Sequence, residues 1–405
     1  MASEWKTVRA ADFIEFNPRL SIKKGAMATK VAMDKLQPFT KKIPATEQAE
    51  FAGGSKFCNG DTIMARITPC LENGKTAFVD VLAEGEVAFG STEFIVMRAK
   101  AGVSDPQFVY YLATSPAFRN VAIKSMVGSS GRQRVQQSVL DELELTVPPL
   151  EEQKKIGDFL AALDQKIAQN NQINDNLQQQ LATVYKSWYQ DFSQATDTDL
   201  IETTYGLIPK GYRYVLLGDL CQSVSVTHKF NKEKLIFLNT GDIENGHFLH
   251  SNFMSVKEMP GQAKKTIAPR DILYSEIRPI NRHFAYVNFP SDDYVVSTKL
   301  MVIRSKGIDS RRLYNYLTSE EIINELQHQA ETRSGTFPQI RFDNVSRLPI
   351  LIADDKTERF FIELLHTVYD QIEHINSENK RLVAIRDALL PKLMSGEIDV
   401  SDIQL

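Results

Sequence analysis

The sequence predicts an α+β protein in which two similar α/β globular domains are separated by two long antiparallel coiled-coil helices, related by a pseudo-twofold internal repeat. Two observations lead to this prediction. Apolar residues recur at steps of three and four along two stretches, which is the spacing of a helix that packs along another helix. The same register returns 205 positions later, and short matches between the globular parts follow the same order.

Each of the two helical stretches has its own apolar seam. The first seam consists of Leu160, Leu163, Ile167, Asn170, Asn174, Leu177, Leu181, Val184 and Trp188. The second consists of Leu365, Val368, Ile372, Ile375, Asn379, Leu382, Arg386, Leu389 and Leu393. Corresponding seam positions differ by 205, so one chain is expected to carry two copies of a unit.

The globular parts match in short segments whose offset drifts as loop insertions and deletions would cause. Matched pairs are Asp61 and Asp271 (offset 210), Ala77 and Ala285 (208), Ser91 and Ser297 (206), Tyr111 and Tyr316 (205), and Ser130 and Ser334 (204). The period is far longer than that of a solenoid repeat, so it indicates two domains and not an array.

The expected order of elements sets the domain boundaries. The first domain covers residues 1–149, with β-type runs at 62–67, 75–81, 93–97 and 143–147 and a helix at 106–123. The predicted divisions that follow are a first helix at 150–192, a second domain at 193–353, a second helix at 354–395 and a tail at 396–405. Pro148 and Pro149 end the last strand of the first domain. Glu151 and Glu152 favour the start of a helix, and Pro391 is expected to stop or kink the second one.

Polar residues interrupt both seams. Asn170, Asn174 and Asn379 are expected to fix the register of the two helices, because a buried Asn in such a seam restricts alignment and partner number. Asn174 and Asn379 occupy equivalent repeat positions, and Arg386 is a fourth interruption. Antiparallel pairing within one chain would place the two domains at opposite ends, and a parallel homodimeric coil is the alternative.

Composition limits the possible classes of protein. The apolar fraction is 42%, and no run approaches the roughly 20 apolar residues of a membrane span. The N-terminus shows no secretory signal, and the three cysteines lack metal-type spacing, so buried thiols in a reducing cytoplasm are expected. Net charge is −4, yet residues 5–42 hold nine cations against three acids, and residues 106–140 hold no acid.

Matched polar loops are the candidate binding surface. They lie at 66–75, 90–93 and 128–134 in the first domain and at 278–283, 297–299 and 333–341 in the second. Arg pairs with guanine edges, Asn and Gln with adenine, and Ser, Thr and Lys suit phosphates, so the loops suit double-stranded DNA. The candidate DNA-binding residues are Arg66, Thr68, Asn73, Lys75, Ser91, Thr92, Ser129, Arg132, Gln133, Arg134, Arg278, Asn281, Arg282, His283, Thr298, Lys299, Arg333, Ser334, Thr336, Gln339 and Arg341. Ordinary hydrophilic turns are the alternative interpretation.

Catalysis is not expected in this chain. Residues 73–76 (NGKT) resemble the end of a phosphate-binding loop, but Pro69 stands where its first glycine is required. Neither an amino-methyltransferase motif, nor a metal-ligand set, nor a Ser/His/Asp or Cys/His arrangement stands out.

The chain resembles the specificity (S) subunits of type I restriction–modification systems along essentially its whole length. Residues 147–156 (VPPLEEQKKI) resemble the central conserved region of that family, and residues 388–398 (ALLPKLMSGEI) its distal one. Residues 206–212 (GLIPKGY) are similar to the opening of a second target recognition domain. Residues 354–359 (DDKTER) depart from the usual repeat of the Pro-Leu-x-Glu-Gln pattern, which weakens the expected second partner contact.

The resemblance implies two target recognition domains, each binding one half of a split DNA site, with the helices setting the gap. The first seam spans about 30 residues, roughly 45 Å at ~1.5 Å per residue, or about a dozen base pairs. It further implies two methylation (M) and two restriction (R) subunits as partners. S-adenosylmethionine, ATP and Mg would belong to those partners, and this chain would need no cofactor or metal.

Two other classes remain at this stage. A coiled-coil scaffold that binds only proteins would show no DNA affinity even with partner subunits present, and a stand-alone restriction or methylation enzyme would turn over as the purified chain. The bases recognised, the length of the spacer and the division between base and phosphate contacts do not follow from the sequence.

Overall fold

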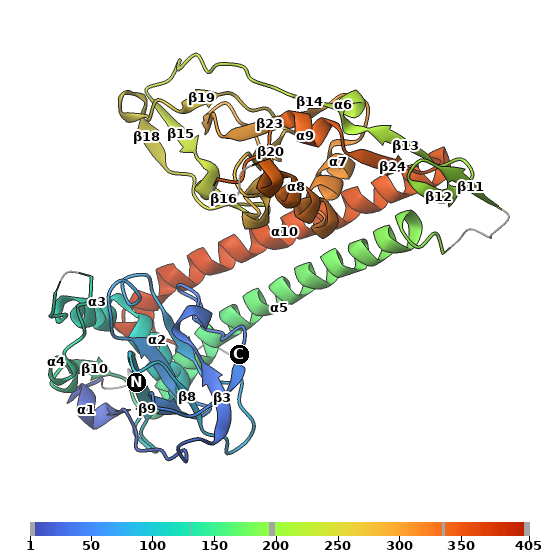
Figure 1. Ribbon diagram of the computed structural model, residues 1–405. Helices are drawn as coiled ribbons and strands as arrows, with labels where there is room; N and C mark the ends of the chain where they lie inside the picture. The colour runs from blue at the N-terminus through green and yellow to red at the C-terminus, as the bar shows by residue number, and fades with distance from the viewer. Residues whose placement is uncertain (1–4, 130, 194–198, 334–336, 401–405) are drawn as a thin grey trace. The chain divides into compact units, whose positions relative to one another are not determined.

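The computed structural model describes residues 5–129, 131–193, 199–333 and 337–400 (Figure 1). Its contacts divide the chain into two compact units. Unit 1 comprises Met1–Asp175 and Glu373–Leu405, and unit 2 comprises Asn176–Ile372. Each unit therefore contains one globular domain together with part of each long helix.

Unit 1 begins with the blue-to-cyan domain in Figure 1. Its strands are β1 (Lys6–Arg9), β2 (Ile14–Phe16), β3 (Met27–Val31), β4 (Glu47–Glu50), β5 (Lys56–Phe57), β6 (Thr62–Ala65), β7 (Thr76–Phe78), β8 (Ala88–Gly90), β9 (Phe94–Ala99) and β10 (Glu144–Val147). Its helices are α1 (Ala10–Phe13), η1 (Met33–Lys35), α2 (Pro106–Thr114), α3 (Pro116–Lys124), α4 (Gln137–Asp141) and the first part of α5 (Leu150–Tyr189).

Unit 2 has the corresponding elements. Its strands are β11 (Leu200–Thr203), β12 (Gly206–Pro209), β13 (Arg213–Leu216), β14 (Cys221–Ser223), β15 (Lys234–Leu238), β16 (Ile243–Glu244), β17 (His247–Phe248), β18 (Phe253–Ser255), β19 (Ala263–Lys265), β20 (Ile272–Ser275), β21 (Phe284–Tyr286), β22 (Tyr294–Ser297), β23 (Leu300–Ser305) and β24 (Pro349–Ile352). Its helices are α6 (Leu217–Leu220), η3 (Thr240–Asp242), η4 (Val256–Glu258), η5 (Pro279–Asn281), α7 (Ser310–Leu317), α8 (Glu320–Arg333), α9 (Phe342–Ser346) and the first part of α10 (Asp355–Met394).

The two units share the topology of two four-stranded sheets and one strand pair, and unit 2 has the further pairs β11-β12 and β16-β17. Unit 1 contains sheets of order β2-β9-β6-β7 and β4-β3-β8-β5 with the pair β1-β10, and unit 2 contains β14-β23-β20-β21 and β18-β15-β22-β19 with the pair β13-β24. Even the parallel contact recurs, between β3 and β8 and between β15 and β22. The internal duplication inferred from the sequence is therefore present at the level of topology.

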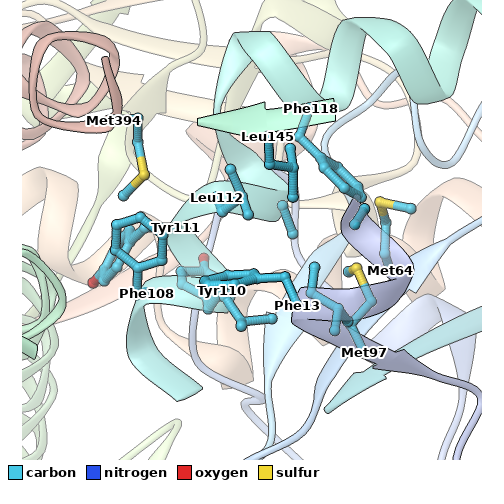
Figure 2. Close-up of a cluster of buried hydrophobic side chains, with 14 of the residues drawn as sticks. Phe13, Met64, Met97, Phe108, Tyr110, Tyr111, Leu112, Phe118, Leu145 and Met394 are labelled. Atoms are coloured by element: carbon cyan, nitrogen blue, oxygen red, sulfur yellow. The ribbon is translucent and has the colours of Figure 1, made fainter. Parts of the chain in front are cut away.

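The core of unit 1 joins the domain to both long helices. Phe108, Tyr111 and Leu112 of α2 pack in one buried cluster with Leu160 of α5 and with Met394 of α10. Figure 2 shows the α2 side chains with Phe13, Met64, Met97 and Met394 around them. Because full burial of each such side chain contributes about 1.5–3 kcal/mol, this cluster holds the helix ends to the domain.

Each unit also contains a buried carboxylate at the same place. Asp61 accepts two 2.7 Å hydrogen bonds from Arg98 and one of 2.8 Å from the Cys58 amide. In unit 2, Asp271 accepts bonds of 2.6 and 2.8 Å from Arg304 and one of 2.7 Å from the Ala268 amide. Removing the arginine from such a pair would leave a buried and unpaired carboxylate, so both residues are needed in each copy of the repeat.

The first turn of each long helix is anchored by one buried polar side chain. Gln153 of α5 donates to the carbonyls of Val103 and Pro148 and accepts from the Asp105 amide. Glu358 of α10 stands 205 positions later and accepts from the Ala353 amide, the Tyr189 hydroxyl and the buried Arg312 guanidinium. The departure of residues 354–359 from the family pattern therefore keeps the anchor and changes its chemistry from an amide to an ion pair.

Two local expectations were wrong, and Pro391 does not stop the second long helix. The helix expected at 106–123 is two helices, because Ser115 caps α3 and Pro116 begins it. The second long helix continues through Pro391 to Met394, one residue short of the predicted 395, and burial of Leu393 and Met394 offsets the backbone hydrogen bond that proline cannot donate. Of the three cysteines only Cys221 is buried, while Cys58 and Cys70 are partly exposed.

A lysine enclosed by aromatic rings fixes the loop after η1. The Lys41 ammonium lies 4.8 Å from the Tyr111 ring centroid, 5.2 Å from that of Phe78 and 5.4 Å from that of Tyr110. It donates hydrogen bonds to Gln107 and to the Tyr111 hydroxyl. Burial lowers the pKa of Lys41 to about 8.

We expect Lys41 to make folding more favourable as the pH rises above 8. Between pH 8 and the ordinary lysine pKa of about 10.4, the unfolded chain binds the proton that the folded chain has released, so the unfolding free energy rises with pH. Urea unfolding of the protein and of Lys41→Met should show that, from pH 8 to pH 10, the free energy of unfolding rises more for the wild type than for the variant. An unchanged difference would contradict the lowered pKa.

Candidate nucleic-acid interface

Strand pairing brings two of the predicted loops of unit 1 together. Ala65, the last residue of β6, pairs with Phe94, the first residue of the antiparallel β9. The loop that leaves β6 therefore starts beside the loop that enters β9, and the Arg66 amide donates to the Glu93 carbonyl at 2.9 Å. This arrangement follows directly from the antiparallel register.

The third predicted loop joins the same surface through Thr68. Its amide donates to the Gln133 carbonyl at 3.0 Å, and its hydroxyl accepts from the Gln133 amide at 3.1 Å. A bridge between Ile67 and Arg134 continues this contact. The loops at 66–75, 90–93 and 128–134, predicted separately, thus meet in one cluster, which we call loop cluster 1.

An ion pair spans loop cluster 1. Arg134 donates to both carboxylate oxygens of Glu93, with the shortest contact at 2.7 Å. These hydrogen bonds hold the pKa of Glu93 below its ordinary value. Arg66 turns inward instead and donates to the Val135 carbonyl at 3.1 Å.

The remaining candidates of unit 1 divide by exposure. Thr68 is buried, and Lys75 is half-buried with its ammonium donating to the Met33 carbonyl at 3.0 Å. Ser91 accepts from the Glu93 amide, so it shapes its own turn. The exposed candidates are Asn73, Thr92, Ser129, Arg132 and Arg134, with Gln133 half-buried. Exposed amide and guanidinium groups on a fixed loop are the groups that contact base edges and phosphates.

Unit 2 builds an equivalent loop cluster 2. Ser275 at the end of β20 pairs with Leu300 at the start of β23, and the Glu276 amide donates to the Lys299 carbonyl at 3.0 Å. A bridge between Ile277 and Gln339 brings in the third loop. Each of these contacts has its counterpart in unit 1, so the loops predicted at 278–283 and 297–299 also converge with residues 337–341, the described end of the loop predicted at 333–341.

The two clusters carry opposite charges at equivalent positions. Arg66 and Glu93 of unit 1 correspond to Glu276 and Lys299 of unit 2, at offsets of 210 and 206. The backbone bond between the two positions is retained, while the Lys299 ammonium now lies 3.8 Å from the Glu276 carboxylate. The same backbone scaffold therefore carries a different arrangement of charges in each unit.

Two arginines of loop cluster 2 have strained backbones. Arg278 and Arg282 flank η5 with φ of 42° and 56°, in the left-handed region that side chains other than Gly, Asn and Asp rarely adopt. Arg278 and Asn281 are exposed, whereas Arg282 pairs with Glu320. Such strain is concentrated at functional sites in proteins.

The other candidates of unit 2 are placed as follows. The His283 ring Nδ1 hydrogen bonds to the Ile243 carbonyl at 2.7 Å, and the Thr298 amide donates to the Gln262 carbonyl at 2.9 Å. Gln339 is half-buried and Arg341 is exposed. Arg333 is the last residue of α8. Ser334 and Thr336 lie outside the described residues.

The acids that pair with the loop cations were not predicted from the sequence. Glu93, Glu276 and Glu320 each form an ion pair with an Arg or Lys that was predicted as a DNA-binding residue. The repeat could have indicated the first two, because Glu276 is equivalent to Arg66 and Lys299 is equivalent to Glu93. No comparable pattern marked Glu320.

Polar seam residues connect the two long helices within unit 1. The Asn170 amide donates to Asn379 at 2.8 Å and to Glu378 at 2.7 Å, and the Asn174 amide donates to Asn376 at 2.9 Å. Asp164 accepts from Arg386 at 2.7 Å. As residue numbers rise along α5 their partners fall along α10, so the helix segments in this unit are antiparallel.

Other kinds of site were sought in the part of the chain that the structure describes. No group of three or more metal-ligating side chains occurs there. Within the same residues, no helix has the length and apolar character needed to cross a bilayer.

Comparison with known proteins identifies the class. The family model of the type I restriction modification DNA specificity domain matches residues 2–179 and 209–383, one match for each half of the repeat. The chain therefore belongs to this family of specificity subunits, which confirms the resemblance drawn from the conserved segments.

Individual relatives agree with this assignment. The HindI type I specificity subunit of Haemophilus influenzae is 43% identical over 176 residues, which is 43% of this chain and only 38% of that protein. The MjaIX specificity subunit of Methanocaldococcus jannaschii is 23% identical over 306 residues, covering 73% of this chain and 70% of that one. A solved type I system S subunit from M. genitalium matches the fold with a TM-score of 0.55 at 15% identity, over 97% of this chain and 96% of that one.

The Asp164–Arg386 pair should stabilise unit 1 as a pair. Both side chains are about 90% buried, with 11% and 12% of their surface exposed. Arg386→Gln should lower the free energy of unfolding by about 3 kcal/mol, because the carboxylate would lose its cation and keep only the hydrogen bond from the Tyr111 hydroxyl. Adding Asp164→Asn should recover a large part of the loss, because two neutral amides can hydrogen bond in the same place.

Chemical denaturation of the single and double variants measures this coupling. The exposed Lys154–Glu151 pair is the control, and Lys154→Gln should change stability by less than about 0.5 kcal/mol. Strictly additive effects of Asp164→Asn and Arg386→Gln would contradict the coupling.

Proposed function

We propose that this chain is the DNA sequence-specificity subunit of a type I restriction–modification complex, in which each unit binds one half of a bipartite target. The main support is the pair of loop clusters: the same three loops converge in both units, and their charges differ. A scaffold that binds only proteins would give no reason for this matched convergence of Arg, Asn, Gln and Ser side chains.

In this proposal α5 and α10 form an antiparallel coiled coil that sets the gap between the half-sites. The antiparallel contacts of Asn170 and Asn174 in unit 1 support it, as do those in unit 2, where Tyr185 contacts Phe361 and Tyr189 bonds to Glu358. A helix rises about 1.5 Å per residue, so length along the coil converts directly into spacing along DNA.

Catalysis is assigned to partner subunits. Two methylation subunits would transfer a methyl group from S-adenosylmethionine to an adenine in each strand, and two restriction subunits would use ATP and Mg for translocation and cleavage. This chain would carry no cofactor and would act in the cytoplasm, where its DNA target lies.

The proposal is tested by the methylation pattern of cells that express the complete system. Single-molecule sequencing should show one motif consisting of two short specific parts separated by a fixed unspecific gap. A pattern that depends on the partner subunits but not on this chain would contradict the proposal.

Changes in loop cluster 1 should relax one half-site only. Arg132→Ala with Gln133→Ala removes an exposed guanidinium and a half-buried amide, at a cost of about 1–3 kcal/mol of discrimination for each base pair lost. Sequencing of methylated DNA should then show added bases in one part of the motif. Arg278→Ala with Gln339→Ala is the matched control and should relax the other part. Equal loss at both parts would indicate a folding defect.

Lengthening the helix should lengthen the gap. Four residues inserted at 178–180 of α5 add about 6 Å, or about two base pairs at roughly 3.4 Å each. The motif should keep both specific parts with a longer gap between them. An unchanged gap would exclude the coil as the spacer.

A further inference from the structure

Phe39 occupies a position that folding alone does not explain. Its side chain is 59% exposed, and its backbone is left-handed, with φ of 54°. A bulky residue in that region costs on the order of 1–3 kcal/mol. The ring contacts Gly74 and Arg119 but stays more than half exposed, so burial offsets only part of that cost.

The segment that carries Phe39 is held firmly. The Phe39 amide donates to the Gly74 carbonyl at 3.0 Å, and the Phe78 amide donates to the Lys41 carbonyl at 2.9 Å. Two residues beyond Phe39, the Lys41 ammonium is enclosed by three aromatic rings. The exposed ring is therefore presented from a fixed point, which lowers the entropy lost when it makes a contact.

The ring rests on loop cluster 1. A Cβ added at Gly74 would lie 2.6 Å from the Phe39 ring, so the ring covers that glycine. The Arg119 guanidinium lies 5.3 Å from the ring centroid and donates to the carbonyls of Leu71 and Glu72. Phe39 thus extends the surface formed by the loop at 66–75, whose other end contacts Gln133 through Thr68.

Unit 2 has the same backbone conformation at the equivalent position, but without an aromatic side chain. Asn245, 206 positions after Phe39, has φ of 45° and donates its amide to the Arg282 carbonyl at 2.8 Å. Arg282 corresponds to Gly74 at an offset of 208 and also has a left-handed backbone. Asn is tolerated in this conformation. Unit 1 therefore has Phe39 and Gly74 where unit 2 has Asn245 and Arg282.

The chemistry of the exposed ring limits what it can contact. It has no hydrogen-bond donor or acceptor, so it requires an apolar group. The ring lies beside loop cluster 1, whose exposed side chains include Asn73, Arg132 and Arg134. In the major groove of DNA that group is the C5-methyl of thymine, which apolar side chains including Phe contact.

We propose that Phe39 is a specificity residue that packs against a thymine methyl group in the half-site bound by unit 1, at the place where unit 2 uses Arg282. This inference rests on the proposed function. It adds a direct apolar contact to the hydrogen-bonding side chains of loop cluster 1.

The test measures binding of the full chain, assembled with its partner methylation subunits, to duplexes carrying the methylated motif. Each thymine of the unit 1 half-site is replaced in turn by deoxyuridine, which lacks only the methyl group. For the wild type, one replacement should weaken binding on the order of fourfold, the effect of one buried methyl. Phe39→Asn should weaken binding to the thymine duplex by a similar factor and abolish the response to deoxyuridine.

Two controls separate this role from others. Phe39→Asn installs the residue that unit 2 has in the same conformation, so its melting temperature should not fall. Phe253→Asn removes an equally exposed ring, 56% accessible, on β18 of unit 2, and should leave affinity and the deoxyuridine response unchanged. Because no charge is removed, the salt dependence of binding by Phe39→Asn should match that of the wild type.

Several results would overturn the inference. They are a deoxyuridine response that persists in Phe39→Asn, a half-site with no sensitive thymine, and a lower melting temperature of the variant, which would make Phe39 a packing residue. Failure of the wild-type complex to bind any duplex specifically would instead contradict the proposed function.

Discussion

Burial of the apolar seams of α5 and α10 is the constraint on which the rest of the molecule depends. In unit 1 the seam buries Leu160 and Leu393 with the α2 core, and in unit 2 it buries Leu181 and Leu365. Each helix is continuous over 40 residues and takes part in both units. Within each unit the domain is tied to the helix that follows it by a side chain of the first turn, the buried Gln153 in α5 and the largely buried Glu358 in α10. Asn170 and Asn174 add hydrogen bonds between the two helices within unit 1, where a buried Asn is expected to favour one register over others.

Duplication followed by divergence is visible in the chemistry of the two units. Asp61 with Arg98 and Asp271 with Arg304 have kept the same buried geometry, because a carboxylate without its cation there is costly. The surface loops show the opposite tendency. Their backbone bonds are retained, while charge is exchanged between positions 66 and 93 on one side and 276 and 299 on the other. The backbone at these half-buried positions is retained while their charges differ, so the exchange of side chains did not require a change of fold.

The elements with strong periodicity were predictable, and the details set by packing were not. The first helix begins at Leu150 as expected, since two prolines and two glutamates mark its start, and it ends at Tyr189, three residues before the predicted 192. The second ends at Met394, one residue before the predicted 395. The break at Ser115 was missed because an apolar period continues across it. The sequence predicted the three loops at matched positions in the two units, but not that they converge. Their convergence depends on strand register, which places Arg66 beside Glu93 and belongs to the tertiary structure. Phe39 left no signal, because an exposed aromatic residue has no pattern in sequence.

The central claim is that α5 and α10 of one chain pair in opposite directions, and a cross-link tests it most directly. In a chain whose three cysteines are replaced by serine, Asn170→Cys and Asn379→Cys would be joined by a short bifunctional maleimide and the products separated by mass. The account predicts efficient linkage within a single chain of 45.8 kDa, and a peptide joining positions 170 and 379. Linkage only between two chains, as a parallel homodimeric coil requires, would contradict it.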